Sequence, residues 1–257
     1  MSTTTATFVR LRWRLLRGAV RHGGAEQVGA VISTIASVLA GTGIGVAAAI
    51  GGRTSDHPGD LAVIFCSVVL LGILGFGIVA GISQPIDPRV IAAEPLSDRD
   101  RALGLLAASA FGPPGLAGIT IGVGLTAGMV RGLTSVPVTV AAAVGWLLSM
   151  LLLARTATNL LSLFISRFPR LGQVAAGLSG LLFYGLFQFI PAAIGDLEDE
   201  QRTRLAGVFA WSPPGQLGRA MHAAADSPAS ALAHLGAGVA WLPFLAIAFF
   251  VSARRLA

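Results

Sequence analysis

Residues 28–50 decide the fold: they run V-G-A-V-I-S-T-I-A-S-V-L-A-G-T-G-I-G-V-A-A-A-I without one charged side chain. At a rise of about 1.5 Å per residue, a helix of this length crosses the roughly 30 Å hydrocarbon core of a bilayer. Because lipid offers backbone groups no hydrogen bonds, such a segment must be helical. Five more apolar runs follow, at 61–83, 103–130, 138–154, 171–194 and 231–253. The sequence therefore predicts an all-α polytopic membrane protein in which residues 28–253 form six transmembrane helices.

The composition of the 257-residue chain excludes a water-soluble fold. Hydrophobic residues make up 54% and charged residues 12%, with a mean hydropathy of +0.77, whereas soluble domains carry about 25% charged residues. The isoelectric point near 11.3 does not indicate nucleic-acid binding, because the arginines are dispersed at the ends of the apolar runs and form no single basic face. The single cysteine, Cys66, excludes an intrachain disulfide framework.

The arginines predict how the chain is oriented in the membrane. With six helices, 13 of the 18 basic residues fall on one side, in the N-terminal segment, in the connections after the second and fourth runs, and at the C-terminus. The other five fall on the opposite side, where most of them share a loop with an acidic run at 196–200. Positive residues accumulate on the cytoplasmic side. We therefore expect a multi-pass plasma-membrane protein with both termini, including a short tail at 254–257, in the cytoplasm.

Residues 1–27 are predicted to contain a cytoplasmic amphipathic helix. On a helix at 8–21, Arg10, Arg14 and Arg17 share one arc with Arg21, and apolar residues cover the opposite arc. Such a helix lies in the membrane interface, with its arginines toward lipid phosphates or a partner. The alternative is a flexible tail whose charges only set the orientation.

The connection at 84–101 is predicted to be structured. Its prolines favour turns around a short helix, and Ser97 and Asp100 have the spacing of a capping box at the start of the third run. A solvated loop with an ordinary helix cap is the alternative.

Two helices carry further local signals. Pro113 and Pro114 predict a kink or break within the third run, because each removes a backbone donor and clashes with the preceding turn. The fourth run is expected to continue as one helix to Arg167, with Arg155 extending toward the interface.

The connection at 195–230 is the longest and is expected on the outer side. Trp211 suits the membrane interface, where aromatic side chains gather. Pro213 and Pro214 favour a turn, and the residues after them are expected to form a short helix on or dipping into the outer leaflet.

The sequence contains no pattern typical of an enzyme. It lacks H-E-x-x-H, paired carboxylates within an apolar run, and a phosphate-binding G-x-x-x-x-G-K-[ST] loop. The surroundings of Ser179 and His234 look like the Ser and His motifs of rhomboid intramembrane proteases. However, a polar loop separates the two residues, and we expect them near opposite faces of the bilayer. We therefore predict no enzymatic activity, no metal and no cofactor in this chain.

Three motifs, in order along the chain, resemble the permease subunits of type-two ABC exporters of the large actinobacterial kind. They are F-V-R-L-R-W-R-L-L-R-G-A at 8–19, I-D-P-R-V-I-A-A-E-P-L-S at 86–97 and W-S-P-P-G-Q-L-G-R-A at 211–220. The resemblance implies an interfacial elbow helix, a cytoplasmic coupling region that touches a separate ATPase subunit, and short helices near an outer gate. By position, the elbow would include Arg10, Arg14 and Arg17, the coupling region Asp87, Arg89, Glu94 and Asp98, and the outer gate Trp211, Pro213 and Pro214.

The resemblance also implies a mechanism and partners. ATP hydrolysis in the partner ABC ATPase would drive alternating access, in which the helix bundles rock and expel a substrate. Because larger relatives join two six-span halves in one polypeptide, this chain would pair with a second copy or with another half, or be a fragment of a longer chain. A membrane scaffold or assembly protein without a transport path is the alternative.

Overall fold

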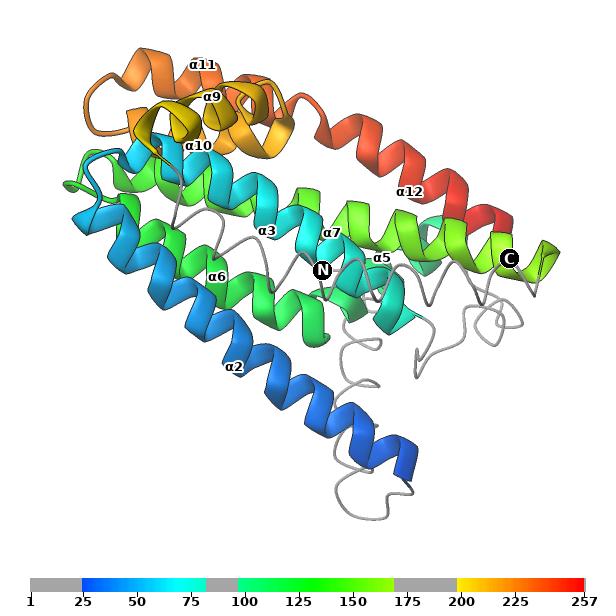
Figure 1. Cartoon of the computed structure of the whole chain (residues 1–257). Coiled ribbons are helices and arrows are strands. Elements are labelled where there is room, and N and C mark those ends of the chain that lie inside the picture. The colour runs from blue at the N-terminus through cyan, green and yellow to red at the C-terminus, as the bar shows by residue number, and fades with distance from the viewer. Residues whose placement is uncertain (1–24, 82–96, 169–197, 257) are drawn as a thin grey trace.

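The computed structural model describes residues 25–81, 97–168 and 198–256, and all secondary structure in these ranges is helical. The predicted all-α class is confirmed for this part of the chain. The helices, shown in Figure 1, are α2 (Ala25–Thr54), α3 (Pro58–Gly81), α5 (Asp98–Ala110), α6 (Pro113–Met129), α7 (Val136–Arg167), α9 (Asp199–Phe209), α10 (Pro213–Ala223), α11 (Pro228–Val239) and α12 (Leu242–Leu256).

Several of these helices are suited to a membrane. Within the described ranges, three stretches are long and apolar enough to cross a bilayer: Val31–Thr54, Val136–Arg167 and Pro228–Arg255. The bent pair Ala102–Ala110 and Pro113–Met129 makes a fourth if it is one broken span. The second predicted run is the apolar helix α3, and the fifth, at 171–194, lies outside the described residues. The chain is therefore consistent with a membrane protein, while six spans and cytoplasmic termini stay predictions.

The third run is interrupted where its prolines predict. Helix α5 ends at Ala110 and α6 begins at Pro113, and the two are bent by 59°. Proline fits the first turn of a helix, where its missing N–H has no intrahelical partner, but it cannot continue a helix that reaches it. The cap at the other end of α5 is also confirmed, since Ser97 Oγ accepts a hydrogen bond from the Asp100 backbone N–H at 3.1 Å. The third run thus consists of two helical pieces with a defined start and a defined break.

The fourth run is one continuous helix to Arg167, as predicted, but the sixth run is not. The single helix expected at 231–253 is instead α11 followed by α12, with turn residues between Val239 and Leu242. Pro243 explains the break, because its ring lacks an N–H and clashes with the carbonyl of the residue four positions earlier, Val239. The two pieces still pass together as one stretch that can cross a membrane.

Helices α2 and α6 pack against each other more extensively than any other pair among the described helices. They run side by side in the same direction, so that both end at the same end of the molecule (Figure 1). Their backbones touch: a Cβ atom added to Gly124 would lie 2.1 Å from the Gly45 carbonyl oxygen, and one added to Gly45 would lie 2.6 Å from the Thr120 carbonyl oxygen. Only glycine permits this separation, so these two residues set the distance between the helices.

The core lies beside this pair, between α3, α6, α7 and α10. Its largest fully buried side chains include Trp146, Ile121, Leu125, Met150 and Leu217. The Trp146 indole Nε1 donates a 2.9 Å hydrogen bond to the Cys66 carbonyl oxygen, which joins α7 to α3 in the interior. Ser67 Oγ donates a 2.8 Å hydrogen bond to the Val63 carbonyl oxygen of its own helix. Many hydroxyl side chains in membrane helices are hydrogen-bonded in this way.

We predict that Gly45→Ala destabilises the protein, because the added methyl group would meet the α6 backbone, which cannot yield as a flexible side chain would. Overpacking of this kind costs about 1–3 kcal/mol, so the midpoint of thermal unfolding in detergent, followed by circular dichroism, should fall. Gly43→Ala is the matched control, since nothing lies within 4 Å of a Cβ at this neighbouring position of the same helix. Equal effects of the two substitutions would contradict the close packing of α2 on α6.

Candidate functional site

Only part of the predicted site lies within the described residues. The elbow arginines Arg10, Arg14 and Arg17 fall outside them, and so do Asp87, Arg89 and Glu94 of the coupling region. Asp98 is the first residue of α5. The three outer-gate residues, Trp211, Pro213 and Pro214, are described and lie at the start of α10.

The outer-gate residues lie at what we call the cap end of the bundle. The cap end comprises the C-terminal ends of α2 and α6, the connections at 55–57 and 130–135, and helices α9, α10 and α11 (Figure 1). These connections are the ones that the arginine count places together on the outer side. The starts of α2 and α5 and the ends of α7 and α12 lie toward the opposite end.

The short helix expected after the diproline is present at the cap end as α10, but it begins at Pro213 itself and not after a turn. Ser212 is the N-cap of α10, where its Oγ accepts a 3.2 Å hydrogen bond from the Gly215 N–H, and the prolines occupy the first turn. Trp211, one residue earlier, is 87% exposed, whereas Pro214 is buried. The chain therefore turns inward between these two residues.

Helix α10 is packed into the bundle and does not lie on its surface. It contacts α3, α7 and α11, and its Leu217, Ala220 and Met221 side chains are fully buried. Gly218 lets it approach α3 closely, since a Cβ there would lie 2.7 Å from the Ala62 carbonyl oxygen. The Oγ atoms of Ser67 and Ser212 lie 3.3 Å apart and add a polar contact between the same two helices. Helix α10 thus fills the cap end of the bundle between α3 and α7.

Side-chain hydrogen bonds of Gln216 hold α10 to α9 and α11, its neighbours along the sequence. Gln216 Nε2 donates to the Ala210 carbonyl oxygen at 2.6 Å, and Gln216 Oε1 lies 2.7 Å from His234 Nδ1 of α11. Gln216 thereby connects the end of α9, α10 and α11. The role of Gln216 is not apparent from the sequence, because His234 lies 18 positions away and only the packing of α10 on α11 brings the two side chains together.

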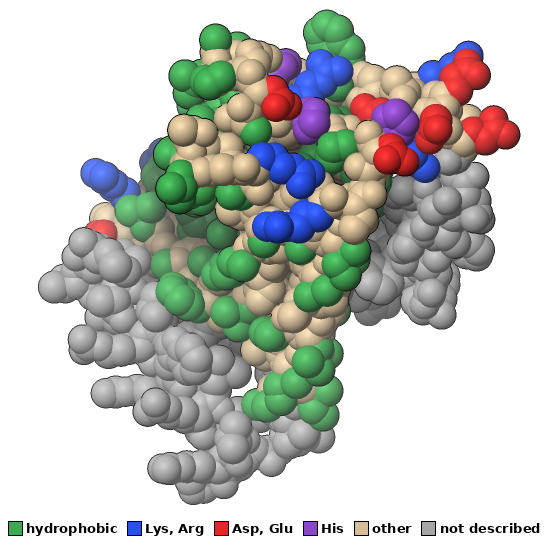
Figure 2. All heavy atoms as spheres, turned by 90° about the vertical axis from the view of Figure 1, so that its left-hand side faces the viewer, with side chains coloured by type: hydrophobic (Ala, Val, Ile, Leu, Met, Phe, Trp, Pro, Cys, Tyr) green, Lys and Arg blue, Asp and Glu red, His purple; other side chains and the backbone are tan. Residues whose placement is uncertain are grey.

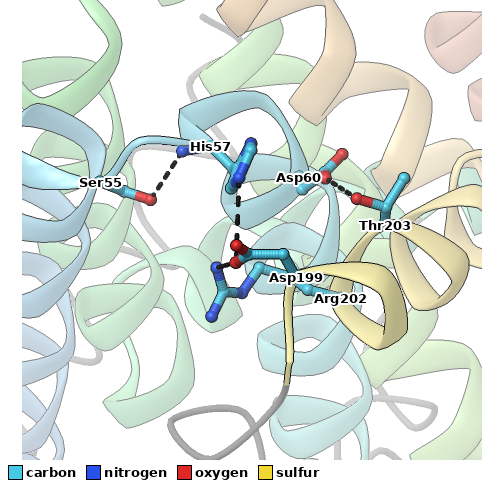
Figure 3. A network of polar contacts seen from close by, with 6 residues as sticks. All are labelled: Ser55, His57, Asp60, Asp199, Arg202 and Thr203. Carbon is cyan, nitrogen blue, oxygen red and sulfur yellow. Dashed lines mark hydrogen bonds and ion pairs between the residues drawn. The ribbon is translucent and has the colours of Figure 1, made fainter.

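Charged residues of α9 face the turn between α2 and α3, as Figure 3 shows. His57 Nε2 lies 3.8 Å from Asp199 Oδ1, which also accepts a 3.0 Å hydrogen bond from Arg202 Nη1. Thr203 Oγ1 donates to Asp60 Oδ2 at 3.0 Å. Exposed ion pairs contribute only about 0–1 kcal/mol each, so these contacts add little to the apolar packing of α9 on α3. Figure 2 shows the same end of the molecule with its acidic, basic and histidine side chains gathered on one face.

A second group of polar contacts lies away from the cap end. Arg155 of α7, expected to extend toward the interface, donates through Nε to Ser109 Oγ in the last turn of α5. One turn further along α7, Asn159 Nδ2 donates to Ser252 Oγ of α12 at 3.1 Å, and both side chains are buried. Polar groups inside a membrane bundle are costly unless they are hydrogen-bonded, within their own helix or to a neighbouring one. These two contacts therefore connect α5 and α12 to the same stretch of α7.

Within the described residues, helices α9, α10 and α11 close the cap end and are joined by polar contacts. No set of side chains described in these ranges has the arrangement of a catalytic site. No group of three metal-ligating side chains occurs within the ranges that the structure describes. Ser179 lies outside those ranges, and His234 is bonded to Gln216. Comparisons with protein-family models, with curated proteins and with solved structures found no match for this chain. Its function must therefore be inferred from its own residues.

We predict that Gln216→Leu loosens the cap end. The substitution removes the amide that bonds the Ala210 carbonyl oxygen and His234, and a buried polar group left without its partner costs about 1–3 kcal/mol. The unfolding midpoint in detergent should fall accordingly. Gln201→Leu, the same change at an exposed position of α9, should leave the midpoint nearly unchanged. If both variants melt like the wild type, Gln216 does not hold these three helices together.

Proposed function

We propose that this chain is the membrane-spanning permease subunit of an ABC exporter that works with a separate ATPase subunit. The observation that carries the proposal is helix α10 of the chain's third motif, which begins at the diproline of W-S-P-P-G and is packed between α3 and α7 at one end of the bundle. A buried helix that closes one end of a membrane bundle is a suitable outer gate. It has to shift before a substrate can leave by that end.

The arrangement of α5 suggests how force from an ATPase would enter the bundle. In the proposal, the ATPase touches the coupling region, which includes Asp87, Arg89, Glu94 and Asp98. Helix α5 begins at Asp98 and ends at the 59° break before α6. A push on the coupling region would therefore tilt α5 about this break, while α6 stays packed on α2. The Ser109–Arg155 bond would pass the movement on to α7, one of the helices against which α10 packs.

The proposed permease also has a defined orientation in the membrane and defined partners. Both termini and the coupling region lie in the cytoplasm of a plasma-membrane protein, and α10 lies on the outer side. The elbow arginines Arg10, Arg14 and Arg17 anchor the chain in the inner interface. A second six-span half, either another copy or a paired permease, completes the transport path, and ATP is hydrolysed only in the partner subunit.

Co-purification tests the proposal most directly. The tagged full chain is extracted from its native membrane in mild detergent, and an ABC ATPase should co-purify with it and show ATPase activity. Reconstituted vesicles should then export a substrate only with ATP. A membrane scaffold would instead bring down other membrane proteins and show no ATP-dependent transport, which would overturn the proposal.

We predict that reversing the charges of the coupling region, as Arg89→Glu with Glu94→Arg, uncouples the ATPase from the permease. Hydrogen bonds to charged groups are worth about 1.5–3 kcal/mol, so stimulation of the ATPase by the permease should fall by about tenfold or more, while basal ATPase activity persists. The control reverses an exposed, oppositely charged pair in α9, as Glu200→Arg with Arg204→Glu. Unchanged stimulation in the Arg89 and Glu94 variant would show that these residues do not couple the two subunits.

A further inference from the structure

One face of α2 carries large apolar side chains that nothing in the described structure covers. Ile32, Ile35, Leu39, Val46 and Ile50 are each between 53% and 68% exposed. At 100° per residue, all five lie within an arc of about 60°, on the side of the helix away from the glycines that contact α6. We call these five residues the α2 stripe.

Arg53 continues the α2 stripe at the cap end. It falls within the same arc and is exposed. From Ile32 to Arg53 the helix rises about 30 Å, which equals the thickness of a hydrocarbon core. When the stripe faces acyl chains, Arg53 consequently lies at the level of the lipid phosphates. This placement depends on α2 crossing the membrane and does not depend on transport.

Arg131 lies near Arg53 because each of the two arginines donates hydrogen bonds across the contact between α2 and α6. Arg53 donates through Nε and Nη2 to the Ala127 carbonyl oxygen, at 3.1 and 2.9 Å, and Arg131 donates through Nη2 to the Gly52 carbonyl oxygen. Both carbonyls lie in the last turn of their helices, where backbone acceptors lack intrahelical donors. The exchange holds the two guanidinium groups at neighbouring helix ends, each with further N–H donors that these bonds do not use.

The positive charges of Arg53 and Arg131 are suited to binding an anion. None of the ion pairs among the described residues includes Arg53 or Arg131, and both side chains are exposed. At the same end, Asp199 and Glu200 pair with arginines of α9, and Asp60 accepts from Thr203. Leu133, two residues after Arg131, is 91% exposed, as expected of a side chain that enters the apolar part of the interface.

We propose that Arg53 and Arg131 bind the phosphate of an anionic phospholipid whose acyl chain lies along the α2 stripe. Guanidinium groups suit phosphate because they offer paired donors as well as charge. The apolar stripe leads along α2 to Arg53, and Arg131, from the connection after α6, bonds the same end of α2 at the Gly52 carbonyl oxygen. A single amphipathic molecule can therefore contact the stripe with its acyl chain and both arginines with its headgroup. A second copy of the chain could cover the stripe, but it would have to bring carboxylates to the two arginines.

Native mass spectrometry of the detergent-purified full chain tests the proposal. The protein is equilibrated with micelles that contain equal amounts of phosphatidylglycerol and phosphatidylcholine, and the bound copies of each lipid are counted. We expect the wild type to retain phosphatidylglycerol about tenfold more than phosphatidylcholine, because the two arginines attract the net negative charge of phosphatidylglycerol. Equal retention of the two lipids by the wild type would overturn the proposal without any variant.

The variants place the preference at this site. Arg53→Gln with Arg131→Gln should abolish the selectivity, while Arg53→Lys with Arg131→Lys should keep part of it because the charge remains. Arg204→Gln, which removes a cation from the same end of the molecule, should retain the wild-type preference. Loss of selectivity in Arg204→Gln as large as in the double glutamine variant would overturn the site. So would a lipid-free dimer that forms in the wild type and dissociates in the double glutamine variant, because a second copy would then occupy the stripe.

Discussion

The close contact between the backbones of α2 and α6 is the constraint on which the other helices depend. Within a bilayer the lipid is as apolar as a leucine side chain, so helices associate through packing and polar contacts more than through the hydrophobic effect. Gly45 and Gly124 bring the two backbones within reach of each other. Because the pair is parallel, the negative ends of both helix dipoles lie together at the cap end. Arg53 and Arg131 offset this arrangement by donating across the pair to its terminal carbonyls.

With α6 fixed on α2, the parts of the bundle differ in how freely they can move. Helix α5 is separated from α6 by the break before Pro113, so its angle is set by contacts with α7 and α12 and not by a continuous helix. Helix α10 is held to its surroundings by side-chain bonds of Gln216 and by the close approach of Gly218 to α3. The proposed transport mechanism requires a rigid part and a part that tilts. In that proposal the rigid part is the glycine-packed pair, and the break at 111–112 would allow α5 to tilt.

The features that the sequence predicts correctly are those with a local cause. The break before Pro113, the start of α10 after Ser212 and the cap at Ser97 each follow from the chemistry of a few adjacent residues. Pro243 is an equally local signal, and the interruption between α11 and α12 could have been predicted from it. The bonds of Gln216 to His234, Arg155 to Ser109 and Arg53 to Ala127 could not, because they join residues far apart along the chain that only the packing of the helices brings together. The elbow arginines and most of the coupling region lie outside the described residues, so their predicted roles stay predictions.

In α2, residue size and not hydropathy separates the face that points inward from the face that points outward. In α2 the glycines face α6, whereas isoleucine, leucine and valine side chains of the α2 stripe point away from the protein. A soluble helix would be arranged the other way, with its largest apolar side chains in the core. In lipid those side chains lose nothing by facing outward, and the small residues gain close van der Waals contact by facing inward. In α2, the positions of small and large apolar residues therefore separate the face packed on α6 from the exposed face, whereas hydropathy varies little around the helix.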